Sequence, residues 1–149
     1  MRDILVPVSP GELLDKITIL RIKAARITAP EKLRNVSVEL DLLTSIWREI
    51  WRDSGCAAQP DSESARALAA DERALEAVNG KLWDIEDRIR EKELAQRFDA
   101  EFIELARAVY LSNDERADIK KRINVRLGSR IVEEKSYARY RRSVYSAPQ

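Results

Sequence analysis

The sequence contains no histidine and only one cysteine, Cys56. Without an imidazole, the chain cannot build Ser-His-Asp or Cys-His nucleophile systems, imidazole general bases or histidine-containing zinc sites. A single thiol cannot form an intramolecular disulfide, which fits a reducing compartment. Any bound metal would therefore need oxygen ligands, which favours magnesium or calcium, and any general base would be Asp, Glu, Lys or Tyr.

Glycine and proline are also scarce, with four and five among 149 residues. The glycines are scattered, so the chain has no glycine-rich phosphate loop, and the few breaks allow long regular elements. A charged fraction of 36% beside a hydrophobic fraction of 44% is typical of amphipathic helices with one solvated face. The apolar run in MRDILVPVSPGE is too short for a signal peptide or a membrane span. We therefore predict a cytoplasmic protein without a membrane partner.

Hydrophobic periodicity predicts four long helices. Ser9 is the predicted N-cap of the first, with Pro10 as its first residue and Glu12 closing a capping box. A new helix begins at Pro30, where Thr28 and Glu31 repeat the capping spacing. The third helix is expected over residues 65–94. The fourth is expected from an Asp99 cap to Leu127, followed by a C-terminal glycine at Gly128.

These helices predict an all-α fold and a single helical domain over residues 1–149. Residues 53–64 form a linker between two antiparallel helical hairpins, arranged as an up-down bundle or a long coiled coil. The lead-in at residues 4–6 could pair with residues 131–132 as a minor strand element, and residues 129–149 form a basic Tyr/Arg tail. At 1.5 Å per residue the last two helices are each roughly 40 Å long. Because such helices are long for a compact monomer of this size, we predict a homodimer.

The fourth helix has an unusual face, which loses its apolar stripe after Val109. The same face continues with Asn113, Lys120 and Asn124, and an uncompensated buried polar group costs about 1–3 kcal/mol. The third helix has a matching polar edge that begins at Asn79 and Trp83. We predict a polar cleft between the first, third and fourth helices, lined by Asp15, Lys16, Glu86, Asp87, Arg90, Asn113, Arg116, Lys120 and Asn124. The alternative is that these residues fix the register of the bundle or reach solvent.

Positive charge is concentrated towards the C-terminus. Residues 116–142 carry a net charge of +7, so the rest of the chain carries −6, which suggests an acidic body in contact with a basic end. The tail YARYRRSVY interleaves aromatic and basic residues that can stack on bases and bind phosphates, or dock on a partner chain. The candidate anion-binding or partner-binding residues are Arg126, Tyr137, Arg139, Tyr140, Arg141 and Arg142.

The leading functional prediction is a non-enzymatic binding or assembly protein that holds a small polar ligand in the polar cleft, without a cofactor. One alternative is a magnesium-dependent nucleotide or phosphate-ester hydrolase that uses Asp15, Glu86 and Asp87. It rests on acidic pairs three residues apart, which are common on any charged helix. The second alternative is a nucleic-acid-binding protein that acts through the basic end.

Four sequence blocks together resemble a family of uncharacterised bacterial proteins, catalogued as a domain of unknown function. The blocks are SPGELLDKITILRIK, LWDIEDRIREKE, FIELARAVYLSNDERADIKKRIN and VEEKSYARY. The resemblance covers nearly the whole chain and is weakest in the linker. It implies a complete, stand-alone bacterial protein and supplies no catalytic assignment.

Overall fold

The computed structural model describes residues 4–136, which form four helices and no strand. The helices are α1 (Pro10–Arg26), α2 (Pro30–Asp53), α3 (Glu63–Leu94) and α4 (Ala100–Arg126). The predicted all-α fold is therefore confirmed. None of the helices in the described part of the chain is long and apolar enough to cross a membrane.

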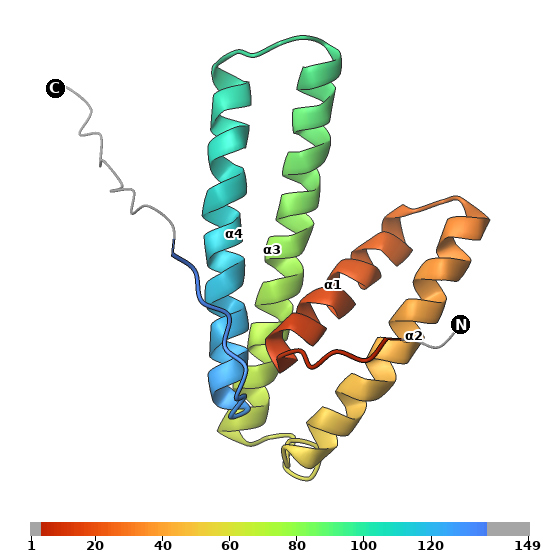
Figure 1. Ribbon diagram of the computed structural model, residues 1–149, viewed down its shortest axis with the longest axis vertical. Helices are drawn as coiled ribbons and strands as arrows, with labels where there is room; N and C mark the ends of the chain where they lie inside the picture. Colours follow the sequence, from red (N-terminus) through yellow and green to blue (C-terminus); the bar gives the residue numbers. More distant parts are fainter. Residues whose placement is uncertain (1–3, 137–149) are drawn as a thin grey trace, which may run out of the picture.

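The helices form two antiparallel hairpins that meet through α1 (Figure 1). The backbone of α1 lies next to those of α2, α3 and α4, whereas α1 is the only described helix whose backbone lies next to that of α2. The α1–α2 hairpin leans away from the α3–α4 hairpin, and the outer half of α3–α4 extends past the end of α1 (Figure 1). The predicted hairpins are therefore present, but α2 does not complete a four-helix bundle. Three helices, α1, α3 and α4, surround the region where the predicted cleft residues lie.

Three of the four helices begin at a side-chain cap. Ser9 Oγ accepts a hydrogen bond from the Glu12 amide at 3.2 Å, and Asp99 Oδ1 accepts one from the Phe102 amide at 3.1 Å. Ser62 caps α3 in the same way, so α3 begins two residues before the predicted start. The predicted Thr28 cap is wrong, because Ala29 holds the N-cap position of α2 without a side-chain bond. Pro30 begins α2 instead through its fixed backbone angle.

The core lies where the lower part of α3–α4 meets α1 and the end of α2. Its most completely buried large apolar side chains are Leu14, Ile17, Leu68, Leu75 and Ile123. Trp47 of α2 and Cys56 of the linker belong to the same cluster. Each buried Leu or Ile contributes about 1.5–3 kcal/mol of hydrophobic stabilisation. The linker therefore also contributes to the core, and its thiol is buried.

The apolar stripe of α4 does not end at Val109, which corrects the sequence-based prediction. Leu105, Ile119 and Ile123 are buried, and Val109 is only half-buried. The buried face continues on residues adjacent to the predicted ones, and Lys120 and Asn124 are buried beside it. Because α4 packs against both α1 and α3, its buried surface is wider than a single stripe and includes polar as well as apolar positions.

The predicted strand pairing of residues 4–6 with residues 131–132 is absent, since neither segment forms a strand. Pro7 lacks the amide hydrogen that a ladder would use. The chain after α4 instead folds back along α4. Glu133 Oε2 lies 2.9 Å from Lys120 Nζ, and Lys135 Nζ donates to the Asn113 carbonyl at 3.0 Å. These polar contacts hold the segment against the helix without a strand.

Ser112 lies on the same face of α4 as Leu105 and Ile119, seven residues from each. Its buried Oγ has no hydrogen-bond partner among the described residues. An orphaned buried hydroxyl costs about 1–3 kcal/mol, and alanine is the better helix former. We expect Ser112→Ala to raise the free energy of unfolding in urea by about 1 kcal/mol. The matched control is Ser45→Ala on α2, where an exposed hydroxyl bonds the Leu42 carbonyl. Equal effects of the two substitutions would contradict the prediction.

Candidate functional site

A buried polar network joins α1, α3 and α4 at Asn79. The amide nitrogen of Asn79 donates to Asp15 Oδ1 at 2.7 Å and to Thr18 Oγ1 at 3.0 Å. Its amide oxygen accepts a longer hydrogen bond, 3.5 Å, from Nη1 of Arg116 on α4. Asn79, Asp15 and Thr18 are all buried. The two α1 residues therefore fix the orientation of the amide that Arg116 meets.

Lys120 on α4 connects this network to the chain after α4. Its ammonium lies 2.6 Å from Glu12 Oε2 and 3.8 Å from Asp15 Oδ2, in addition to the Glu133 contact. Burial by itself lowers the pKa of Lys120, but the hydrogen bonds to Glu12 and Glu133 outweigh it and raise that pKa. The hydrogen bond from Lys120 lowers the pKa of Glu133. Both pKa shifts favour the charged forms of Lys120 and Glu133.

The first turn of α1 lies directly on the α4 backbone. The Gly11 amide donates to Asn124 Oδ1 at 2.8 Å. A Cβ at Gly11 would lie 2.6 Å from the Lys120 carbonyl oxygen and 2.8 Å from Asn124 Oδ1. Only glycine permits this approach without movement of one helix. The contact fixes where α1 crosses α4, and so places Glu12 and Asp15 next to Lys120.

A groove of about 540 Å³ lies beside this network. Asn79 belongs to both, because its side chain is part of the groove wall. The groove is lined by Ile19 of α1, by Asn79, Leu82, Trp83, Glu86, Asp87 and Arg90 of α3, and by Asn113 and Arg116 of α4. Its wall is therefore built from the three helices that were predicted to form a polar cleft.

The predicted cleft residues fall into three groups. Glu86, Asp87, Arg90, Asn113 and Arg116 line the groove. Asp15, Lys120 and Asn124 lie in the buried polar contacts beside it. Lys16 belongs to neither, because its exposed ammonium lies 3.6 Å from Glu39 on α2.

The prediction did not include Thr18 or Glu133, which have no distinctive spacing in the sequence. Asn79 and Trp83 belong to the predicted polar edge of the third helix but not to the predicted set of cleft residues. Their spacing of four residues from each other, continued at Glu86 and Arg90, was the available signal.

Arg116 is the cation in the groove with the most unused hydrogen-bonding capacity. Arg90 is paired with Glu86 at 3.0 Å, whereas Arg116 has no carboxylate within ion-pair distance among the described residues. Within residues 4–136 its one hydrogen bond is the long one to Asn79, although a guanidinium carries five N–H donors. On the α1 side, Arg26 lies 5.7 Å from the centre of the Trp83 ring. The groove therefore combines a half-buried guanidinium, an aromatic ring and several hydrogen-bonding groups.

The three carboxylates of the hydrolase alternative, Asp15, Glu86 and Asp87, do not form a metal site. Within residues 4–136, no three Asp, Glu or Cys side chains are grouped so that they could hold a metal ion. Asp15 is hydrogen-bonded to Asn79 in the interior, and Glu86 is paired with Arg90. The ligand set that the hydrolase alternative requires is therefore not assembled by the described residues.

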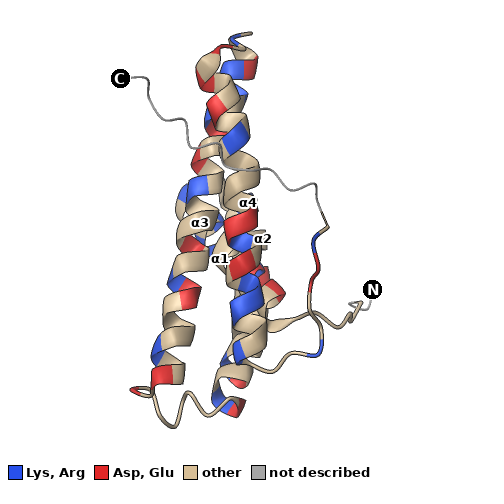
Figure 2. Ribbon diagram, turned by 90° about the vertical axis from the view of Figure 1, so that its left-hand side faces the viewer, with Lys and Arg blue, Asp and Glu red and all other residues tan. Residues whose placement is uncertain are grey.

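At the C-terminal end of α4, basic side chains pair with the acidic Asp71 of α3. Arg122 Nη2 and Arg126 Nη2 lie 3.0 and 3.3 Å from its carboxylate oxygens. Asp71 is buried in the apolar stripe of α3, and these cations offset its charge. Both signs of charge alternate along α3 and α4 (Figure 2). The other predicted anion-binding residues, Tyr137, Arg139, Tyr140, Arg141 and Arg142, lie outside the described residues.

Comparisons with protein-family models, with curated proteins and with solved structures found no match. The family resemblance of the four sequence blocks therefore stays a prediction. The candidate site is defined by its own geometry: a three-helix groove with a rigid polar wall at Asn79 and Arg116.

Proposed function

We propose that this is a non-enzymatic binding protein that holds a small polar ligand in the groove between α1, α3 and α4. The observation that carries the proposal is the buried contact of Asn79 with Asp15 and Thr18. A buried polar group gains little net stability even when it is fully bonded. A binding site, however, needs its contacting side chains held in place by others. Asn79 meets this need, because α1 fixes it and it contacts Arg116.

The properties of Arg116 indicate that the ligand carries an anionic group. A guanidinium matches a carboxylate or a phosphate with two parallel hydrogen bonds. Arg116 is half-buried, and most of its donors are not used by the described residues. Partial burial weakens screening by solvent, so a charge-assisted contact here is stronger than one on an exposed surface. The position is therefore suited to a carboxylate or a phosphate group.

The apolar part of the groove indicates that the same ligand also has an apolar face, which would contact Trp83, Ile19 and Leu82. The indole ring and the two aliphatic side chains give the groove an apolar wall. Asp87 and Asn113 add acceptors and donors for hydroxyl or amine groups. A volume of about 540 Å³ lies in the usual range for small-molecule sites, about 300–1,000 Å³. We therefore expect a ring compound that carries an anionic group.

The test is a thermal-shift screen followed by calorimetry, with each anion matched to its neutral counterpart. The pairs are phenyl phosphate with phenol, uridine monophosphate with uridine, and glucose 1-phosphate with glucose. A ligand present at 100 times its Kd stabilises the folded state by about 2.7 kcal/mol. We expect at least one anion to raise Tm and its neutral counterpart to have little effect. Arg116→Gln should weaken the binding of that anion by about tenfold to a hundredfold.

The control variant is Arg107→Gln on the same helix, which removes a positive charge outside the groove. Arg107 is exposed and pairs with Glu104 at 3.0 Å. Its substitution should leave ligand affinity within about twofold of the wild-type value, since exposed pairs contribute little. If Arg107→Gln weakens binding as much as Arg116→Gln, only the net charge matters and the groove is not the site. Absence of any Tm shift across the anions would also contradict the proposal.

A further inference from the structure

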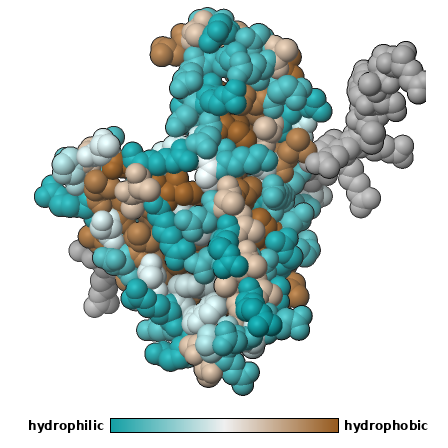
Figure 3. All heavy atoms as spheres, turned by 180° about the vertical axis from the view of Figure 1, so that it is seen from behind, coloured by the Kyte–Doolittle hydropathy of each residue, from teal (hydrophilic) through white to brown (hydrophobic). Residues whose placement is uncertain are grey.

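The outer face of α2 is apolar and has no partner among the described residues. Val38, Leu42 and Ile46 are 70%, 53% and 41% exposed, and their spacing of four residues places them on one side of the helix. The opposite side packs on α1, the only described helix whose backbone lies next to that of α2. Apolar atoms are visible at the surface of the α1–α2 arm (Figure 3). Three consecutive turns of exposed aliphatic side chains form a typical helix-docking face.

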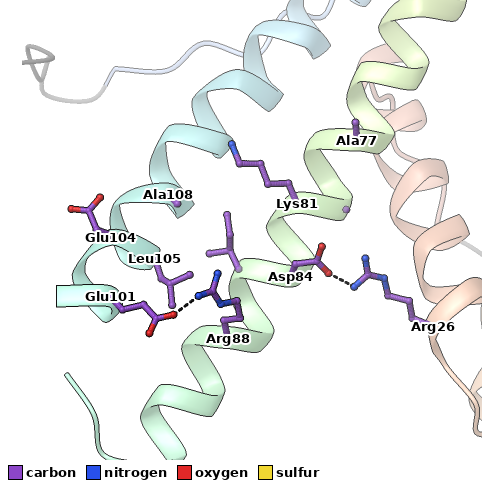
Figure 4. A pocket seen from close by; sticks show the side chains of 11 residues that line it. Arg26, Ala77, Lys81, Asp84, Arg88, Glu101, Glu104, Leu105 and Ala108 are labelled. Carbon is purple, nitrogen blue, oxygen red and sulfur yellow. Dashed lines mark hydrogen bonds and ion pairs between the residues drawn. The ribbon is translucent and has the colours of Figure 1, made fainter. Parts of the chain in front are cut away.

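A second unpartnered feature is a groove of about 700 Å³ on the α3–α4 hairpin, near the end of α1. Figure 4 shows its lining. The apolar part consists of small or aliphatic residues: Ala77, Gly80, Ile85, Leu105 and Ala108. Apart from the surrounding backbone of α3 itself, no described atom lies within 4 Å of the position where a Cβ would stand on Gly80. The ion pairs Arg26–Asp84 and Arg88–Glu101 border it (Figure 4).

We propose that α2 of a second copy of this chain docks in this α3–α4 groove, and that the two copies do so reciprocally. The small side chains at Ala77, Gly80 and Ala108 allow an approaching helix to come close. The stripe of Val38, Leu42 and Ile46 provides the apolar contact. Among residues 4–136, no third helix packs on the α3–α4 hairpin beyond the end of α1 (Figure 1), and a second copy would supply one.

Charge favours this pairing over a direct α2–α2 contact. Glu31, Glu49 and Asp53 are exposed and lie 7 or 11 residues from Leu42, so they share its face. Two such faces packed together would place like charges opposite each other, which is destabilising. The groove lining carries three cations and three carboxylates. Arg26 pairs with Asp84, Arg88 with Glu101, and Glu104 with Arg107 outside the lining, whereas Lys81 has no carboxylate within ion-pair distance among the described residues. Lys81 is therefore available to an acidic helix face.

Reciprocity makes the arrangement a closed dimer. Each copy provides one α2 face and one groove, so a two-fold axis forms two identical contacts and leaves neither surface free. A standard stable interface buries roughly 1,600 Å², and two identical contacts bury twice the area of one.

The experiment measures the dimer dissociation constant by sedimentation equilibrium for the full chain and two variants. Leu42→Glu places a charge on the apolar face. Gly80→Trp fills the groove with an indole ring, and the open space at the Gly80 Cβ position allows this substitution without a clash at that atom. We expect the wild-type protein to dimerise and each variant to weaken dimerisation at least 100-fold, because each damages both contacts. Ser37→Glu is the control: it adds the same charge to α2 outside the face and should leave the dissociation constant within about threefold of the wild type.

Mixing the two variants provides the decisive measurement. In a mixed dimer, α2 of the Gly80→Trp copy and the groove of the Leu42→Glu copy are both intact, so one contact forms. The mixture should therefore dimerise at least about tenfold more tightly than either variant alone. A monomeric wild type, or an effect of Leu42→Glu without an effect of Gly80→Trp, would overturn the proposal. Failure of the mixture to recover any dimer would overturn it as well.

Discussion

Lys120→Met is expected to lower the free energy of unfolding by about 3 kcal/mol, measured by urea denaturation near neutral pH. The substitution keeps most of the apolar stem but removes the cation shared by Glu12, Asp15 and Glu133. Asp15 is buried, and its charge would lose its nearest cation. Glu12 and Glu133 are half-exposed, so solvent can partly replace the ammonium. The loss should therefore lie at the low end of the 3–5 kcal/mol typical of broken buried pairs.

The neighbouring residue gives a matched control. Lys121 is 53% exposed and lies 3.8 Å from Glu134, so Lys121→Met should change the free energy of unfolding by no more than about 0.5 kcal/mol. Both variants lose one positive charge from the same turn of α4. Equal destabilisation would mean that net charge, and not the buried cluster, determines the effect.

Gly11→Ala is expected to lower the free energy of unfolding by about 3 kcal/mol, near the top of the range for overpacking. The added methyl group would lie 2.6 Å from the Lys120 carbonyl oxygen, which belongs to the backbone and cannot rotate away. α1 would have to move away from α4, and this movement would lengthen the hydrogen bond from the Gly11 amide to Asn124. Thermal or urea unfolding of the variant measures the effect.

Gly80→Ala is the control, and we expect it to raise the free energy of unfolding instead of lowering it. Gly80 also lies within a helix, but outside the local α3 backbone no described atom lies within 4 Å of the position of its missing Cβ. Alanine is favoured over glycine in a helix interior by about 0.5–1 kcal/mol, so this variant should be slightly more stable than the wild type. If both glycine substitutions stabilise the protein, the close contact of α1 with α4 is not maintained in solution.

The ends of the helices could be predicted because their signals are local. Ser9 and Asp99 cap amides only three residues away, and Gly128 follows α4 with a positive φ. Such contacts depend on neighbouring residues alone. The Thr28 cap failed because a local pattern cannot show which of two adjacent residues leaves the helical conformation. At α2 that residue is Ala29, with Pro30 directly after it.

The candidate site was predicted only in part, for a geometric reason. Spacing along α3 and α4 placed Glu86, Arg90 and Arg116 on common helix faces, and all three line the groove. The same reasoning assigned Lys16 to the cleft, but its side chain meets α2. A periodic pattern gives the angle of a residue about its own helix and does not identify the neighbouring helix.

The sequence by itself determined the helices, their caps and the accumulation of polar residues in the second half of α4. Only the tertiary structure decided that α2 lies along α1 and not along α3 or α4, and that Lys120 and Asn124 are buried beside Ile119 and Ile123. It also brought Asp15, Asn79 and Arg116 together from three helices. The physical reason is range: helix formation and capping depend on residues within about one turn, whereas these contacts depend on how separate helices cross. That crossing is set by side-chain packing such as the contact of Gly11 with the α4 backbone.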